Sequence, residues 1–406
     1  MKILCVFGQH NYGQPTRGES YEYVNFPPAF KRLGCEVVFF DSWNRSLYVD
    51  FSELNRTLLE TIQTEQPDVV FCVLLGYEIW LETLDIIKKS GVTLINWGTD
   101  DSWKYSQFSR FISSSFHYYL TTSLVAFDRA KEARLGNWVL TQWAASRDSL
   151  ENPVVAADCI YPVAFIGSAY GNRPQWIKRL KSLGVEVFCF GYGWPNGPVT
   201  TEEMRKIIRN SNIVLNFGDS GLHMKGLSIY RDRQIKARIF EVPGGGGFLM
   251  TENADRLNQY FEVGEELIVF SDAEDLAHKI RYFLSHSDVR DQVANQGHQR
   301  VRSEHTYEVR FSKIFDHIRA SGDQMLPTGD VVIDWSVFEH VVLLHRPTSW
   351  MLMTRSALVW LCELIWGAPR GARAARRIMY EVSWRLWKRK TYTSMSFPGR
   401  LFYLES

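Results

Sequence analysis

Short apolar runs alternate with amphipathic segments along this sequence, and the alternation begins again after about residue 160. In the first 150 residues, near-continuous apolar runs such as Lys2–Phe7 and Asp68–Leu74 are typical of parallel strands that helices cover on both faces. The segments Tyr21–Leu33 and Trp80–Lys89 lie between such runs and have helical spacing. This alternation predicts an α/β fold with a doubly wound parallel sheet.

The second series opens with a predicted strand at Pro162–Gly167 and a predicted helix at Arg173–Leu183. A chain of 406 residues is also too long for one ordinary core. We therefore expect two Rossmann-like domains, over residues 1–150 and 159–320, and a basic, Trp-rich helical extension over residues 321–406. Each domain should bind ligands at the carboxyl ends of its strands, and the two should face each other across a cleft.

Charge and cysteine usage narrow the functional class. A formal net charge of +1 argues against a general nucleic-acid binder. The six cysteines form no CxxC pair and lie mostly in apolar runs, which indicates a reducing compartment. The first residues lack the features of a signal peptide, and no stretch offers 18 uncharged apolar residues. We expect a cytoplasmic protein without a transmembrane helix.

Several cofactor motifs are missing from the sequence. It contains no DxD tripeptide and no convincing His/Cys/Asp cluster, so we expect no metal. The loop Gly8–Gly13 after the first strand is not a GxGxxG fingerprint, and no P-loop or GxSxG motif occurs. We therefore expect no bound cofactor, and any diphosphate would be neutralised by Arg, Lys and helix ends.

The strongest local signal is the segment Arg238–Glu252, in which a predicted helix at Asp232–Val242 runs into four glycines and then a strand. Consecutive glycines permit positive φ and a close approach of the backbone to a ligand. Glu241 would fall in the last helical turn, where the helix dipole disfavours a carboxylate, so a ligand with two hydroxyl donors, such as ribose, would explain it. The alternative is a long C-cap turn with a solvated carboxylate.

Two loops that follow predicted strands are further candidates. The segment Val163–Arg173 ends at a helix N-terminus, which binds phosphate well, and Arg173 would add a charge-assisted contact. The segment Phe190–Gly197 mixes glycines with aromatic residues that suit a stacked base or sugar. Ordinary loop and turn chemistry would also explain both segments.

The first domain offers two candidates for proton transfer. His10, in the loop after the first strand, could act as a general base toward a sugar hydroxyl, although an exposed loop histidine is commoner. Asp100 and Asp101 follow the strand that ends at Trp97. One could accept a substrate proton or bind sugar hydroxyls, while the other caps the next helix.

In order and spacing, these segments resemble the CgeB-like (spore maturation protein) branch of the GT-B glycosyltransferases. The likeness covers about residues 90 to 315, from Thr99-Asp-Asp101 to His305-Thr-Tyr307. It implies a GT-B fold and the transfer of a sugar from a nucleotide-sugar donor bound to the second domain. The donor-binding residues expected from the motifs and the resemblance together are Gly167, Ser168, Tyr170, Arg173, Gly191, Tyr192, Trp194, Lys236, Arg238, Glu241, Gly245, Gly246, Thr251 and Glu252.

The resemblance also assigns roles. Glu241 matches the second glutamate of the family's E-x7-E motif, which holds the donor ribose, whereas the first glutamate is replaced by Arg233. Arg238 and Arg173 match residues that serve the diphosphate, and Lys236 and Lys225 are weaker candidates. We expect Arg238, Glu241, His10 and Asp100 to be the catalytic residues.

The expected activity is metal-independent transfer to a glycan, lipid-linked or protein acceptor, as in polysaccharide biosynthesis. Closure of the cleft would align the acceptor hydroxyl with the anomeric carbon. A GT-B sugar-nucleotide epimerase remains an alternative. A catalytically degenerate scaffold or glycan-binding protein is another, because Arg233 replaces a sugar-contacting glutamate.

The C-terminal extension has a charge pattern of its own. Between Arg370 and Lys390 there are eight basic residues and one acid, Glu381. Helical phasing places Ala375, Ile378, Met379, Val382 and Leu386 on one arc, opposite Arg370, Arg373, Arg377, Arg385 and Lys388. Such a helix suits an anionic membrane surface, here the inner face of the plasma membrane. The alternative is that it packs on the first domain.

Overall fold

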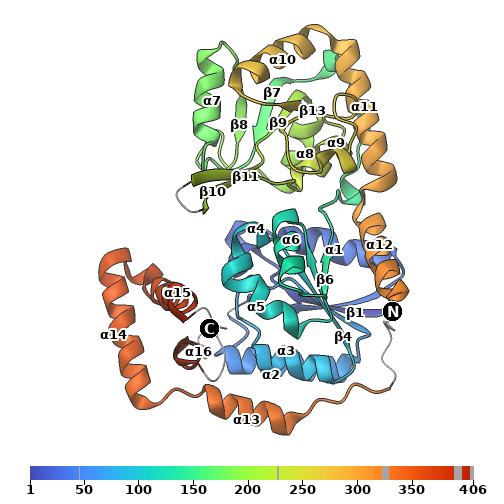
Figure 1. Cartoon of the computed structure of the whole chain (residues 1–406). Helices are drawn as coiled ribbons and strands as arrows, with labels where there is room; N and C mark the ends of the chain where they lie inside the picture. The colour runs from blue at the N-terminus through green and yellow to red at the C-terminus, as the bar shows by residue number, and fades with distance from the viewer. Residues whose placement is uncertain (45, 226–227, 322–328, 388–395, 403–406) are drawn as a thin grey trace. The chain divides into compact units, whose positions relative to one another are not determined.

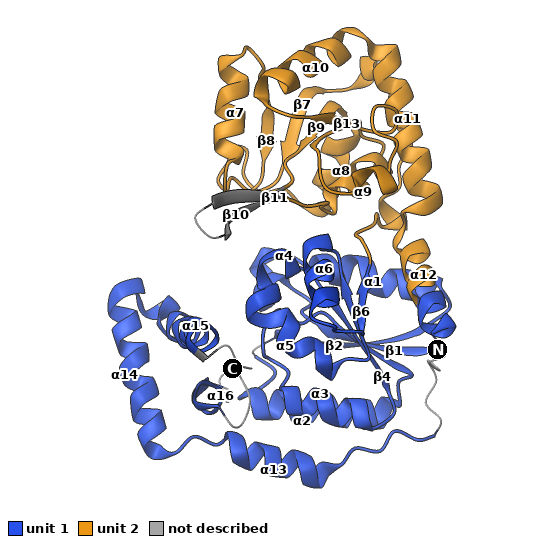
Figure 2. Ribbon diagram, in the orientation of Figure 1, with its two compact units in different colours: residues 1–140, 315–406 blue, residues 141–314 orange. Residues whose placement is uncertain are grey.

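The computed structural model describes residues 1–44, 46–225, 228–321, 329–387 and 396–402. The chain divides into two compact units, which we call unit 1 (residues 1–140 and 315–406) and unit 2 (residues 141–314) (Figure 2). Each unit contains a parallel β-sheet with helices packed on it (Figure 1). The predicted pair of doubly wound α/β folds is confirmed.

Unit 1 holds a six-stranded parallel sheet with the order β2-β1-β3-β4-β5-β6. Its strands are β1 (Lys2–Phe7), β2 (Glu36–Asp41), β3 (Val69–Cys72), β4 (Thr93–Gly98), β5 (Tyr118–Thr121) and β6 (Trp138–Leu140). Its first helices are α1 (Tyr21–Arg32), α2 (Phe51–Glu65), α3 (Leu81–Lys89), α4 (Asp101–Lys104), α5 (Arg110–Ile112) and α6 (Leu124–Glu132).

Alternate residues of the unit 1 strands contribute side chains to two apolar layers, because successive side chains point to opposite faces of a sheet. Leu4 and Val6 of β1 belong to a core shared with α2, α3 and the C-terminal helices. On the other face, Phe71 of β3 packs edge-on against Phe26 and Phe30 of α1. Both layers are buried, which explains why the strands read as continuous apolar runs.

The C-terminal extension folds into α13 (Trp335–His345), α14 (Ser349–Trp366), α15 (Ala368–Trp387) and α16 (Phe397–Phe402). Phe338 of α13 is fully buried, and its ring stacks on Trp80 with 6.2 Å between centroids. Tyr380 of α15 donates a hydrogen bond to the carbonyl of Gln107. The helices of the extension therefore pack on the first part of the chain within unit 1 (Figure 1).

The phasing expected for α15 is only partly right. Ala375 is buried in the unit 1 core, as expected for the apolar arc. Ile378, Val382 and Leu386 of the same arc are exposed, at 36%, 37% and 70%. The reason lies in tertiary packing: α15 rests on α14 where Gly371 meets the side chain of Glu363, a contact that the helical period alone does not reveal. Lys388–Lys390 lie outside the described residues.

Unit 2 holds a five-stranded parallel sheet with the order β13-β12-β9-β7-β8. Its strands are β7 (Tyr161–Ile166), β8 (Phe188–Phe190), β9 (Ser211–Asn216), β12 (Leu249–Glu252) and β13 (Ile268–Phe270). Its helices are α7 (Arg173–Ser182), α8 (Thr201–Arg209), α9 (Arg238–Gly244), α10 (Ala273–Ser285), α11 (Ser287–Glu304) and the first part of α12 (Tyr307–Ala320). The predicted cap of α8 is confirmed, since Thr200 and Glu203 form a reciprocal capping box.

One helix boundary was predicted wrongly. The segment expected to be helical from Asp232 instead completes an antiparallel hairpin of β10 (Asp219–Lys225) and β11 (Ser228–Arg233). Helix α9 begins only at Arg238, so Glu241 lies in its first turn and not its last. A carboxylate there is favoured by the helix dipole, and the electrostatic reason for a bound diol disappears.

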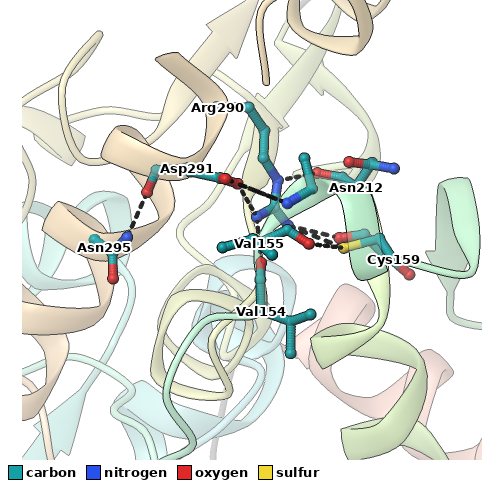
Figure 3. A network of polar contacts seen from close by, with 9 residues as sticks. Val154, Val155, Cys159, Asn212, Arg290, Asp291 and Asn295 are labelled. Atoms are coloured by element: carbon teal, nitrogen blue, oxygen red, sulfur yellow. Dashed lines mark hydrogen bonds and ion pairs between the residues drawn. The ribbon is translucent and has the colours of Figure 1, made fainter. Parts of the chain in front are cut away.

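The segment before β7 is anchored by a buried arginine of α11 (Figure 3). The guanidinium of Arg290, whose side chain is fully buried, donates to the carbonyls of Val154, Ser211 and Asn212 at 2.8–2.9 Å. It also pairs with Asp291, which accepts from the backbone N–H of Ala156. One side chain thus ties the segment to the start of β9.

The His305-Thr-Tyr motif has a similar anchoring role. The backbone of Ala145 pairs with His305 and Tyr307 through two hydrogen bonds of 2.9 and 3.1 Å. Burial lowers the pKa of His305 to about 4, and its neutral ring donates from Nε2 to the carbonyl of Tyr260. Arg310 reaches the carbonyl of Trp143 from α12. His305 and Tyr307, which belong to the sequence resemblance, thus help to hold the chain where it enters unit 2.

Candidate functional site

In unit 2, the direction of winding reverses between β7 and β9, because β8 lies on one side of β7 and β9 on the other. Ligands of doubly wound sheets bind outside the carboxyl ends of the strands at such a switch point. Gly167, Ser168 and Tyr170 follow β7, and Gly218 follows β9. The structure therefore places the predicted post-strand loop at the expected edge of the sheet.

The loops after β7 and β8 are tied together. Gly191 has a φ of 128°, and a Cβ there would lie 2.5 Å from the carbonyl oxygen of Gly167, so only glycine fits. The indole N–H of Trp194 donates to the same carbonyl at 2.7 Å. Tyr170 and Tyr192 are more than half exposed and remain accessible for stacking. Trp194 thus stabilises the conformation of the two loops, whereas the two tyrosines face solvent.

Arg173 opens α7, directly after the β7 loop. Its Nη1 donates to the carbonyl of Ser168 at 3.0 Å, and its guanidinium lies 4.1 Å from the centre of the Tyr170 ring. These contacts hold a cation at the helix N-terminus, where phosphate oxygens are favourably bound.

The second cation of the predicted donor site is Arg238. Its Nη1 lies 3.0 Å from Oε2 of Glu241, and both side chains are mostly buried. Lys236, two residues earlier, is half-buried. The side chain of Lys225 lies outside the described residues. The predicted pair Arg238 and Glu241 is thus brought together at the start of α9.

Arg233, which replaces the family's glutamate, has a partner in this chain. Its Nε lies 3.5 Å from Oε1 of Glu252, whose other oxygen accepts from the backbone N–H of Gly218 at 2.9 Å. Glu252 is only 3% exposed. Thr251 is fully buried, and its hydroxyl accepts a hydrogen bond from Asn216. These residues join the ends of β9 and β12 and leave the Arg233 side chain 42% exposed.

The four glycines at 244–247 are packed against the protein. All four are buried, and Gly246 has a φ of 77° with the carbonyl of Glu151 only 2.7 Å from where a Cβ would lie. A Cβ on Gly247 would meet Ile208 at 2.8 Å. The close approach that requires glycine is thus to residues 151 and 152 and to α8. The expected contact of Gly245 and Gly246 with a donor gains no support from this geometry.

Unit 1 contains a cavity of about 620 Å³, which we call the unit 1 cavity. Its lining includes Gly8 and His10 after β1 and Leu75 and Glu78 after β3. These strands flank the winding reversal of the unit 1 sheet, the place where such sheets bind ligands. His10 and Asp100, the two residues predicted for proton transfer, both line this one cavity.

The cavity also contains a carboxyl that the sequence did not single out. Glu22, in the first turn of α1, is half-buried, and loss of water raises its pKa to about 7, with a smaller contribution from Asp100. A general base with a pKa near the working pH is the most effective kind. Only the tertiary structure supplies this signal, because a glutamate near a helix start is common in any sequence.

The two neighbouring aspartates have separate environments. Asp100 is 46% exposed and lies 3.4 Å from Nζ of Lys104. Asp101 is 3% exposed and accepts hydrogen bonds from Ser109 and Tyr119, and burial raises its pKa. Asp101 therefore holds the local structure, while Asp100 faces the cavity.

Helix α15 of the C-terminal extension contributes one wall of this cavity, which the sequence did not predict. Arg373, Arg376, Arg377 and Tyr380 all line it. Their spacing of three or four residues was visible in the sequence, but the cavity they face was not.

Across the described ranges, no group of three or more His, Cys, Asp or Glu residues could hold a metal ion. Metal independence stays a prediction. None of the described helices alone has the length and apolar character of a membrane span, whereas Ser349–Trp366 and Arg370–Leu386 meet that test as a pair bent by 114°.

The sequence model of a family described as glycosyl transferase-like matches residues 173–316, which include Arg173, Arg238 and Glu241. No curated protein matches the chain. Sucrose-phosphate synthase from Thermosynechococcus elongatus is similar in structure, with a TM-score of 0.54 and 10% identity over 79% of this chain and 100% of that one.

AviGT4, a glycosyltransferase involved in avilamycin A biosynthesis, has a TM-score of 0.52 and 14% identity over 79% of this chain and 97% of its own. HepE of Anabaena in complex with UDP-glucose has a TM-score of 0.49 and 11% identity over 79% and 100% of the two chains. The chain has the GT-B fold, as its similarity to sucrose-phosphate synthase and AviGT4 shows, and the family match supports glycosyl transfer as its general activity.

Proposed function

We propose that this protein transfers a sugar from a nucleotide-sugar donor, bound by unit 2, to an acceptor bound by unit 1. The observation that carries the proposal is the arrangement at the unit 2 switch point. Arg173 stands there at a helix N-terminus after β7. The Arg238–Glu241 pair opens α9 in the same segment that matches the glycosyl transferase-like family. Membership of the CgeB-like branch of these enzymes is part of the same proposal.

In the proposed donor complex, Arg173, Arg238 and the amides of the β7 loop bind the diphosphate. Their positive charge stabilises the departing nucleoside diphosphate in the transition state, so no metal is required. Glu241 accepts hydrogen bonds from the ribose hydroxyls, and the exposed Tyr170 and Tyr192 stack on the base or sugar.

The acceptor enters the unit 1 cavity, where Glu22, His10 and Asp100 are the available proton acceptors. Glu22 is the strongest candidate for the base that takes the proton of the attacking hydroxyl, because its pKa of about 7 lets it both ionise and accept a proton near neutrality. The proposed acceptor is a glycan, a lipid-linked saccharide or a protein.

A membrane-borne acceptor is favoured by the surface of the extension. Leu364 and Ile365 of α14 are 65% and 69% exposed, and Leu386 of α15 is 70% exposed, close in sequence to several arginines. Apolar side chains beside basic ones suit peripheral attachment to an anionic membrane, and we propose the inner face of the plasma membrane.

Thermal unfolding of the pure protein with a panel of nucleoside diphosphates and nucleotide sugars tests the proposal. A ligand at 100 times its Kd should add about 2.7 kcal/mol to the stability of the folded state. Stabilisation by one base family supports a donor site and selects sugars for transfer assays. If no nucleotide stabilises the protein, the degenerate scaffold, already suggested by Arg233, becomes the better explanation. Release of an epimerised donor without an acceptor would point to the epimerase.

A further inference from the structure

The wall of the unit 1 cavity formed by α15 is unusually basic. Arg373, Arg376 and Arg377 line it within little more than one helical turn. Like charges three or four residues apart on a helix repel each other, by roughly 0.2–0.5 kcal/mol per pair. A cluster of this kind on a cavity wall is stabilised when an anion binds there.

Three of the acids that line the described part of the cavity have partners other than Arg373 and Arg377. Glu381, the acid on the same helix, pairs with Arg385 and accepts from Trp384. Asp100 pairs with Lys104, and Glu78 accepts from the indole of Trp43 at 3.0 Å. Within the described residues, Arg373 and Arg377 form no ion pair.

The position of these arginines is fixed by the fold. Tyr380, one turn after Arg376 and Arg377, donates to the carbonyl of Gln107, and its ring lies 6.0 Å from that of Tyr77. Ala375, between the arginines, is buried in the unit 1 core. The packing of α15 therefore keeps the helix backbone that carries these arginines at the cavity without a ligand, so no cost of ordering the helix is added on binding.

We propose that the unit 1 cavity binds an acceptor carrying a phosphate or diphosphate group, held by Arg373, Arg376 and Arg377. The proposal rests on the proposed function and names the acceptor class. Guanidinium groups bind phosphate oxygens in pairs of parallel hydrogen bonds, which an ammonium cannot reproduce. The sugar of the acceptor lies toward Glu22 and the aromatic wall of Trp43 and Tyr77.

The phosphate can belong to a water-soluble glycosyl phosphate or to a lipid-linked saccharide. The test is a calorimetric titration of the full chain with inorganic pyrophosphate, which carries the chemistry common to both. Arg373→Ala/Arg377→Ala is compared with Arg370→Ala, which removes a cation of the same helix that does not line the cavity. We expect the double variant to weaken one pyrophosphate site at least tenfold and the control to leave it unchanged.

Flotation with phosphatidylcholine vesicles that carry a polyprenyl diphosphate distinguishes the sources. Vesicle binding that the double variant abolishes assigns the phosphate to a lipid, and binding of pyrophosphate alone assigns it to a soluble acceptor. Equal pyrophosphate affinity in the wild type and the double variant would overturn the proposal.

Thermal stabilisation by nucleoside diphosphates is measured on the same variants. If nucleoside diphosphates still stabilise the protein but the double variant binds pyrophosphate as tightly as the wild type, only the proposed acceptor class is wrong. If the wild type shows no stabilisation by any nucleotide, the proposed function itself fails.

Discussion

At the scale of single residues, Arg238 is the sharpest test of the donor site. Its guanidinium is held 3.0 Å from the Glu241 carboxylate, where it can serve a diphosphate as well. Arg238→Ala should abolish transfer and weaken nucleoside diphosphate binding by at least tenfold, because a charge-assisted contact contributes about 1.5–3 kcal/mol. Steady-state rates and calorimetry measure both effects.

The matched control for Arg238 is Arg179→Ala, which removes an arginine of unit 2 that is 55% exposed and paired with Glu274 on α10. It should leave transfer and nucleotide binding unchanged. Full activity of Arg238→Ala, with a melting temperature like that of the wild type, would remove Arg238 from the catalytic residues.

For Glu22 we predict that the transfer rate and the stability of the protein depend on pH in opposite directions. If it is the general base, transfer by the wild type should rise with pH through about 7, and Glu22→Gln should lose about 100-fold or more. Its folded pKa lies above the ordinary value of 4.5, so its contribution to stability is present at low pH and lost as pH rises through about 7.

Glu22→Gln should therefore raise the melting temperature at pH 8 and change it little at pH 4. Rates and melting curves of the two proteins between pH 4 and 9 provide the measurement. An unchanged pH–rate profile in the variant would transfer the role of base to His10 or Asp100, which line the same cavity.

At the scale of elements, the anchoring of the segment before β7 depends on one helix side chain. Arg290 of α11 donates to three backbone carbonyls and pairs with Asp291 (Figure 3). Arg290→Met should destabilise the protein by about 3–5 kcal/mol, because it leaves these acceptors buried without a donor. Arg302→Met, on an exposed position of the same helix, should cost less than about 0.5 kcal/mol. Denaturant unfolding measures the free energy of unfolding of both variants. Equal values would contradict the anchoring role of Arg290.

The exposed apolar surface of α14 makes the membrane proposal testable without truncation. Leu364→Glu/Ile365→Glu places two carboxylates on side chains that are 65% and 69% exposed. Flotation with anionic vesicles should fall strongly, because charges oppose insertion into the lipid boundary. Leu47→Glu/Val49→Glu changes two exposed apolar residues before α2 and is the control for added charge. If both variants float as the wild type does, the apolar face of α14 is not the membrane contact.

At the scale of the whole molecule, local sequence patterns predicted the two sheets. They did not predict helix boundaries and buried polar side chains that depend on tertiary contacts. The runs at Lys2–Phe7 and Pro162–Gly167, observed as β1 and β7, were recognisable because parallel strands bury both faces. The helix predicted from Asp232 was wrong because β11 is fixed by pairing with β10, which no helical period reveals. Glu22 and Arg290 were missed because their burial depends on distant segments.

Strand order allowed the positions of several candidate residues to be predicted from the sequence, and their roles stay predictions. The loops after β7 and β8 lie at one sheet edge because parallel strands end together. Arg238 and Glu241, which were both candidates, form an ion pair at the start of α9. The four-glycine turn illustrates the limit, since glycines that accept a ligand and glycines that accept a neighbouring backbone look alike in sequence. Here the structure places Glu151 and Ile208 against them.

The extension is also part of the unit 1 core, and this leads to the last prediction. Phe338 is fully buried: its ring stacks on Trp80, and the guanidinium of Arg56 lies over it. Its neighbour Val337 is 42% exposed. Phe338→Ala should cost about 3–5 kcal/mol of unit 1 stability, and Val337→Ala less than about 0.5 kcal/mol.

Because the chain has two compact units, hydrogen exchange is a better measurement here than a single unfolding curve. The amides of α3, which follows Trp80, should lose protection in Phe338→Ala and keep it in Val337→Ala, while those of β7 and β9 in unit 2 should be unchanged. Full protection of α3 in Phe338→Ala would mean that the extension only rests on unit 1. Its loss would mean that the basic cavity wall on α15 depends on the same core that stabilises the sheet beneath it.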